Sequence, residues 1–187
     1  MKKLFLVAIA TVGFVFSGTA QESQIKVGLD AGIPMGDIKD GSSFNLGANA
    51  AYMWTGVAEG LDVGAGVSYN TYFAKEIEYF DGFENVKEKG DNANFLPIYA
   101  TANYSFTENI FAGADLGYAV GLTDGIDGGF YYQPKVGYQT EMFEVFIGYK
   151  GLSSEQTATF DDGFGGTASI TATTVFSSIN VGFNYKF

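Results

Sequence analysis

The stretch INVGFNYKF, residues 179–187, decides the fold of this chain. In an extended strand alternate residues point to opposite faces, so five large apolar side chains share one face and small or polar ones share the other. A large aromatic face opposite a polar face is typical of a strand that crosses a membrane as part of a β-barrel. The large face consists of Ile179, Val181 and the closing aromatic signal Phe183, Tyr185 and Phe187.

The first residues predict export. Lys2 and Lys3 precede an apolar run over residues 4–16, and small residues at 18–20 suit a signal peptidase, so 1–20 is interpreted as a cleaved signal peptide. A single anchor helix is the alternative, but the run is shorter than the ~20 residues that a membrane span needs. The remaining residues, 21–187, form the expected barrel domain.

The same period of two recurs in seven further segments. With the closing strand, at roughly 170–187, they make eight, an even number as single-chain barrels have. We therefore predict an all-β protein, an eight-stranded antiparallel up-and-down transmembrane β-barrel, with both ends of the domain on the periplasmic side. The seven segments are 25–33, 44–54, 61–70, 96–106, 110–120, 132–139 and 143–150. Long connections are expected at 34–43, 76–92, 123–129 and 154–168, and short ones at 55–60, 107–109 and 141–142.

Aromatic residues are expected to form two lipid-facing girdles, since Tyr and Trp favour membrane interfaces. The periplasmic girdle comprises Tyr52, Trp54, Tyr104, Phe106, Tyr138, Phe143, Tyr185 and Phe187. The outer one comprises Phe44, Phe73, Phe95, Tyr132 and Phe176. Pro97 and Pro134 fit strands poorly, and a late strand start or a bulge is expected at each.

A signal peptide, eight alternating strands and a last strand ending in Phe187 resemble the small outer-membrane β-barrel superfamily, which includes the OmpA barrel, OmpX and OmpW. The resemblance covers the whole of 21–187. It implies a location in the cell outer membrane, contact with outer-membrane lipid, and recognition of the closing strand by the barrel-assembly machinery. It specifies an architecture rather than an activity.

An eight-stranded barrel is just wide enough for its interior side chains to fill it. Four acids and four lysines are predicted to face inward, and their balance favours a paired ionic network in a packed polar lumen. A narrow conduit for solutes is the alternative interpretation. Phe111 and Phe146 are also predicted to point inward, as a plug. The charged residues are Lys26, Asp30, Asp62, Asp115, Lys135, Glu144, Lys150 and Lys186.

The residue types absent from the chain exclude several function classes. Without any His, a Ser or Asp lacks the partner that activates it at neutral pH, so no enzyme activity is expected. Without His and Cys, no zinc site or disulfide can form, and no cofactor is expected. The formal charge of −11 and the absence of Arg exclude a basic nucleic-acid surface.

The sequence therefore predicts a monomeric outer-membrane barrel with a structural and surface-interaction role. The alternative function is a narrow porin-like or OmpW-like channel for small or hydrophobic solutes. Acidic residues gather in the second and fourth long connections, where a surface partner or divalent cations could bind. The stretch Asp124–Gly128 lacks the spaced ligands of a calcium loop. The acidic residues are Glu76, Glu78, Asp81, Glu84, Glu88, Asp91, Glu155, Asp161 and Asp162.

Overall fold

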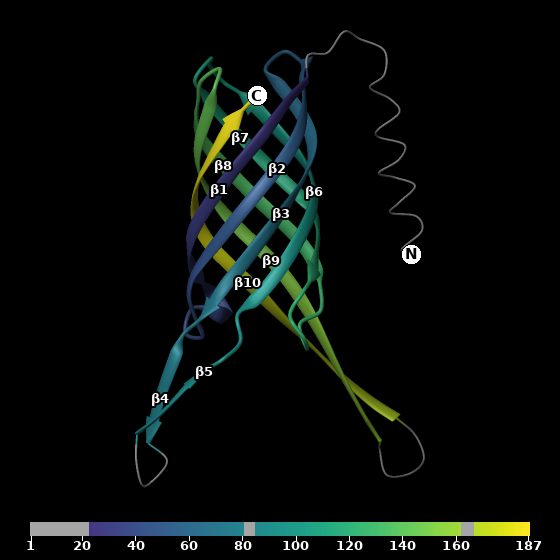
Figure 1. The fold of residues 1–187 in the computed structure, drawn as a ribbon. Coiled ribbons are helices and arrows are strands. Elements are labelled where there is room, and N and C mark those ends of the chain that lie inside the picture. The colour runs from purple at the N-terminus through teal and green to yellow at the C-terminus, as the bar shows by residue number, and fades with distance from the viewer. Residues whose placement is uncertain (1–22, 81–84, 162–166) are drawn as a thin grey trace.

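Eight antiparallel strands close into a barrel in which every strand neighbours the next one along the chain (Figure 1). The computed structural model describes residues 23–80, 85–161 and 167–187. The barrel strands are β1 (Ser23–Met35), β2 (Ser42–Ala58), β3 (Leu61–Ala74), β6 (Ala93–Ser105), β7 (Ile110–Gly121), β8 (Gly129–Gln139), β9 (Phe143–Asp161) and β10 (Thr167–Lys186). The predicted fold class is confirmed.

The last strand closes the barrel against the first. β1 pairs with β10 from Lys26 opposite Lys186 to Met35 opposite Ser177. The seam extends to the terminal residue, because the Phe187 amide donates to the Ile25 carbonyl at 2.8 Å. Closure leaves the barrel without an edge strand, which would otherwise present unpaired backbone groups.

The alternation of the sequence becomes an outer and an inner surface. Apolar side chains point outward all around the barrel, and several are highly exposed, such as Leu29 at 67% and Ile33 at 70%. The intervening positions are buried in the lumen and are mostly polar or small. Among the described residues, no helix is long and apolar enough to cross a membrane.

Strand pairing occurs within two of the connections that the sequence analysis predicted to be long loops. β9 and β10 stay paired as far as Asp161 opposite Thr167, past the end of the barrel, where a loop over 154–168 was expected. That expectation was wrong. The segment lacks the alternation of apolar and polar residues, but backbone pairing between β9 and β10 keeps it extended, and Thr favours strands. Within the second long connection, β4 (Glu76–Phe80) and β5 (Asn85–Lys89) form a separate hairpin (Figure 1).

The prolines interrupt hydrogen-bonding ladders without shifting them. Pairing of β6 with β3 skips Pro97 and the residue before it, and then resumes in the same register. Pro134 has the same effect between β8 and β9. On the opposite side each proline stays paired, with Ala119 and Ala114 respectively. A proline lacks only the N–H directed to one neighbour, so the expected late start or bulge was wrong.

Glycines make room for the larger lumen side chains. Gly182 lies opposite Phe146 on the neighbouring strand, and Gly66 lies opposite Tyr99. A methyl group added at either glycine would overlap the ring of its partner. The lumen is thus filled by pairing one large and one small residue across neighbouring strands.

Replacing Gly182 by Ala tests this packing rule. The added methyl group collides with the Phe146 ring, and overpacking of this kind costs about 1–3 kcal/mol. Urea unfolding of the detergent-folded protein should therefore show a lower midpoint for Gly182→Ala. Gly41→Ala is the matched control, because its new methyl group meets no atom within 4 Å. Equal midpoints for the two variants would contradict the rule.

Candidate functional site in the barrel lumen

The lumen contains a set of buried charged and amide side chains, and an aromatic cluster lies between them and the long connections. Six of the eight charged residues predicted to face inward form three ion pairs, and none of these six side chains is more than 7% exposed. Burial of a charge is tolerated only where a partner and further hydrogen bonds compensate for lost hydration. The surroundings of each pair therefore decide what the lumen can do.

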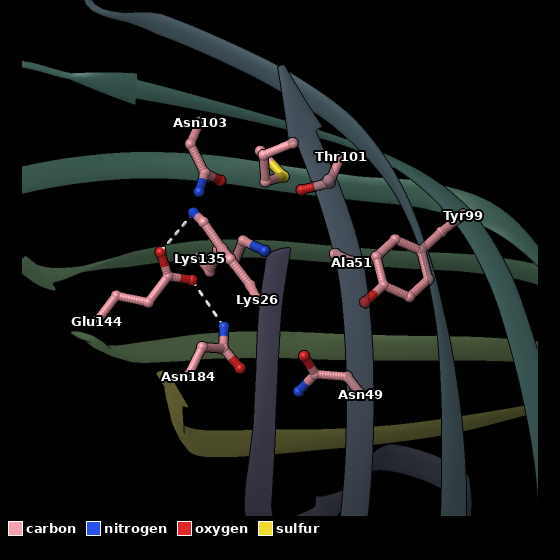
Figure 2. A pocket seen from close by; sticks show the side chains of 10 residues that line it. Lys26, Asn49, Ala51, Tyr99, Thr101, Asn103, Lys135, Glu144 and Asn184 are labelled. Atoms are coloured by element: carbon pink, nitrogen blue, oxygen red, sulfur yellow. Dashed lines mark hydrogen bonds and ion pairs between the residues drawn. The ribbon is translucent and has the colours of Figure 1, made fainter. Parts of the chain in front are cut away.

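The first pair joins β1 to β9 across the lumen. Lys26 Nζ lies 2.6 Å from Glu144 Oε2, and Asn184 Nδ2 from the intervening strand donates to Glu144 Oε1 at 2.7 Å (Figure 2). The Asn103 side chain faces the same ammonium, and the amide orientation that satisfies both groups places its oxygen 3.1 Å from Nζ. The glutamate thus has a hydrogen bond to each oxygen, as a buried carboxylate requires.

The second pair joins the neighbouring strands β7 and β8. Lys135 Nζ donates to both oxygens of Asp115, at 2.8 and 2.9 Å. The same ammonium lies 5.6 Å from the centroid of the Phe146 ring, within the range of a cation–π interaction. Phe111 and Phe146 are both buried in the lumen, at 0% and 4% exposure.

The third pair is the most extensively connected. Lys150 Nζ from β9 donates to Asp30 on β1, to Asn70 on β3 and, at 3.3 Å, to Asn45 on β2. Three acceptors match the three hydrogens of an ammonium group. Asn180 on β10 donates to Asp30 at 2.6 Å and to Asn45 at 2.8 Å. One cluster therefore links five of the eight strands through the centre of the barrel.

Asp62 and Lys186 lie outside these pairs. Asp62 accepts a 2.9 Å hydrogen bond from the Gly56 amide and fixes the short β2–β3 connection. Lys186 donates to the Gln139 side chain at 3.0 Å and to the Thr140 carbonyl at 3.1 Å, at the same end of the barrel. The sequence predicted four inward-facing acids and four inward-facing lysines, but it did not show which acid pairs with which lysine.

An aromatic cluster fills the lumen toward the long connections. Tyr72, Phe95 and Phe176 contact one another with ring centroids 4.9–6.2 Å apart, and Tyr99 contacts Tyr131. Leu152 packs against them, and Ile38 from the short helix η1 (Gly36–Ile38) is buried in the same cluster. We call these seven residues the outer plug: Ile38, Tyr72, Phe95, Tyr99, Tyr131, Leu152 and Phe176.

The outer plug corrects the predicted girdle. Phe95 and Phe176 were expected to face lipid, but they are 1% and 9% exposed inside the barrel. The signal was present in the alternation, because Phe95 and Tyr99 fall on the opposite side of their strand from Ile98. Phe44, at 42% exposure, does lie on the outer surface, where it stacks on Phe73.

The described residues of the acidic connections contain no built cation site. In the described part of the chain, no three or more acidic side chains come together as metal ligands would. In the β4–β5 hairpin the backbone register places Glu76 opposite Lys89 and Glu78 opposite Lys87, and Lys87 Nζ lies 3.4 Å from Glu76 Oε1. Asp81, Glu84 and Asp162 lie outside the described residues. A surface partner or a divalent cation at these connections stays a prediction.

Removing the central ammonium tests the third pair. Lys150→Met keeps the length of the side chain but leaves the Asp30 carboxylate buried without its cation, and breaking a buried pair costs about 3–5 kcal/mol. Urea unfolding should show a loss of this size, and Asp30→Asn in the same chain should recover part of it. A Lys150→Met protein as stable as the native one would contradict a structural role for the cluster.

Comparison with known proteins finds distant structural likenesses only. No family model and no curated protein sequence matches the chain. Among solved structures it is similar to the de novo designed TMB2.3, with 10% identity, coverage of 90% and 98% of the two chains and a TM-score of 0.48. The Yersinia pestis outer membrane protein Ail has 15% identity, coverage of 89% and 99% and a TM-score of 0.45. A major outer membrane protein of Thermus thermophilus has 10% identity, coverage of 89% and 100% and a TM-score of 0.40. Similarities this distant transfer neither a function nor a residue role to this chain.

Proposed function

We propose that the chain is an integral outer-membrane β-barrel protein with a closed lumen, which acts as a structural element and displays its long connections at the cell surface. The observation that carries the proposal is the apolar outer surface of a closed sheet. In water this surface would be an aggregation hazard, since soluble monomers rarely expose large contiguous apolar patches. In lipid it is the favoured surface.

Aromatic residues near the short connections support insertion at a defined depth. Tyr52 contacts Trp54, Tyr104 contacts Phe106, and Tyr185 contacts Phe187, each on the outside of a strand end. Amphipathic rings favour the headgroup level of a bilayer. Figure 1 shows that the β4–β5 hairpin and the extended β9–β10 pair leave the same end of the barrel, opposite the C-terminus. If the short connections lie on the periplasmic side, this end faces the cell exterior.

The filled lumen supports a structural role over transport. From the short connections inward, a solute would meet the Lys26–Glu144 pair, then the Lys150 cluster and then the outer plug. Two cavities between these groups measure ≈10 and ≈20 Å³, and each is too small for a solute. The proposal includes no catalytic step, since the chain has no His. It includes a cleaved signal peptide at 1–20, assembly through the closing strand, and a monomeric state.

Single-channel conductance separates this role from a narrow channel. Protein folded in detergent, recognised by a mobility change on heating in SDS, is added to a planar bilayer. The native protein should give no steady openings, and Asp115→Ala should also stay closed, because the Lys150 cluster and the outer plug remain in series with the lost pair. Steady openings of the native protein would favour the channel.

Surface display can be tested by trypsin treatment of intact cells that carry the protein in their outer membrane. The Lys residues in and directly before the second long connection are Lys75, Lys87 and Lys89, and the Lys87 side chain is 62% exposed. Trypsin should cut within 75–89 from outside. A chain with all three changed to Gln should resist that cut. Cleavage only after the cells are broken would reverse the proposed orientation.

A further inference from the structure

Two small cavities adjoin each other between the ion pairs of the lumen. They measure ≈10 and ≈20 Å³, and Asn49, Tyr99, Lys135 and Asn184 line both. Figure 2 shows the first of them, with side chains from several strands around it. A water molecule needs roughly 10–15 Å³ of such volume. Each cavity therefore admits about one water-sized molecule and nothing larger.

The residues around these cavities carry unused hydrogen-bonding capacity. Three buried side-chain atoms in the described part of the chain have no protein partner, namely Thr101 Oγ1, Gln133 Nε2 and Asn184 Oδ1. Thr101 lines the first cavity, Gln133 the second and Asn184 both. Buried polar groups of native proteins are nearly always hydrogen-bonded to protein or to ordered water.

The opposite ends of the two amides have partners of different kinds. Gln133 Oε1 accepts from the Tyr131 hydroxyl at 2.6 Å, and Asn184 Nδ2 donates to Glu144 at 2.7 Å. A turned Asn184 amide would lose its bond to the Glu144 carboxylate, which only accepts, whereas a turned Gln133 amide would donate to the Tyr131 hydroxyl instead of accepting from it. The free Asn184 group is thus an acceptor, the free Gln133 group is a donor in the orientation that the structure has, and the Thr101 hydroxyl can be either.

This mixture of donors and acceptors selects a neutral ligand. A cation would face the Gln133 N–H and the Lys135 ammonium, and an anion would face the Asn184 oxygen and the Glu144 carboxylate. Water donates and accepts, and it fits the volume. We propose that the two cavities are internal hydration sites, which hold ordered water bonded to Thr101, Gln133 and Asn184.

Water in these cavities would also solvate the charged groups of the ion pairs. Lys26 and Glu144 line the first cavity, Asp30 and Asp115 line the second, and Lys135 lines both. Every ion pair of the lumen thus contributes at least one charged group to a hydration site. Enclosed water dipoles lower the desolvation penalty that opposes burial of so many charges. The outer plug separates the hydrated centre from the end of the barrel with the long connections, and exchange with bulk water should be slow.

Water–protein cross-relaxation measured by NMR on the full chain folded in deuterated detergent tests the proposal. The Gln133 side-chain amide should show a cross-peak with water, of the sign given by long-lived water. Asn180 is the matched control, since it is also buried, its oxygen accepts from the Ser178 hydroxyl at 2.6 Å, and its amide donates only to protein. A cross-peak at both amides, or at neither, would overturn the proposal.

The variant Thr101→Val gives an independent test. Val has the same shape as Thr and the same preference for strand structure. If water satisfies the hydroxyl, its removal lowers the urea midpoint. If the hydroxyl has no partner, its removal relieves a buried unpaired group and raises the midpoint. Thr71→Val is the control, because the Thr71 hydroxyl donates to Asn94 at 2.9 Å. A rise for Thr101→Val beside a fall for Thr71→Val would refute hydration at this site.

Discussion

Closure of the sheet between β1 and β10 is the constraint on which the rest of the structure depends. Hydrocarbon offers no hydrogen bonds, so a sheet that crosses it must pair every strand with two neighbours. Closing with eight strands fixes a lumen about as wide as its own side chains. What faces inward must then fill that width, and what faces outward must suit lipid. The alternation of residues 179–187 meets both demands in one strand.

The narrow lumen explains why charge, amide and aromatic groups occur together inside it. Five strands meet at Lys150 and Asp30 through hydrogen bonds that use every hydrogen of the ammonium. Such a cluster fixes which strands lie opposite one another, a role for which buried polar groups are known in other folds. The outer plug needs no such matching and contributes burial of large rings instead. The Lys150 cluster at the centre of the barrel thus specifies which strands lie opposite one another, and the outer plug at one end provides apolar packing.

Sequence alone was sufficient for the fold because the period of two is local and repeated in every strand. It also placed Lys26, Lys135 and Lys150 inside the barrel, since parity along a strand determines the face. It could not pair them, because Lys150 and Asp30 are 120 residues apart and meet only through the register of the closed sheet. Phe95 was wrongly assigned to the lipid-facing girdle because it is aromatic, although its position in the alternation places it on the lumen side. The β9–β10 extension was missed because backbone pairing, rather than alternation, maintains it.

The central claim is that the apolar outer surface lies in a bilayer, and the single Trp of the chain allows a direct test. Trp54 lies near the end of β2 that leads into the short β2–β3 connection, on the outside, against Tyr52. Its fluorescence is measured in vesicles of lipids brominated at different depths along the acyl chain. The account predicts quenching by brominated lipid, strongest for bromines near the headgroups, and little quenching by aqueous iodide. Quenching by iodide without any effect of brominated lipid would contradict membrane insertion and favour a soluble barrel.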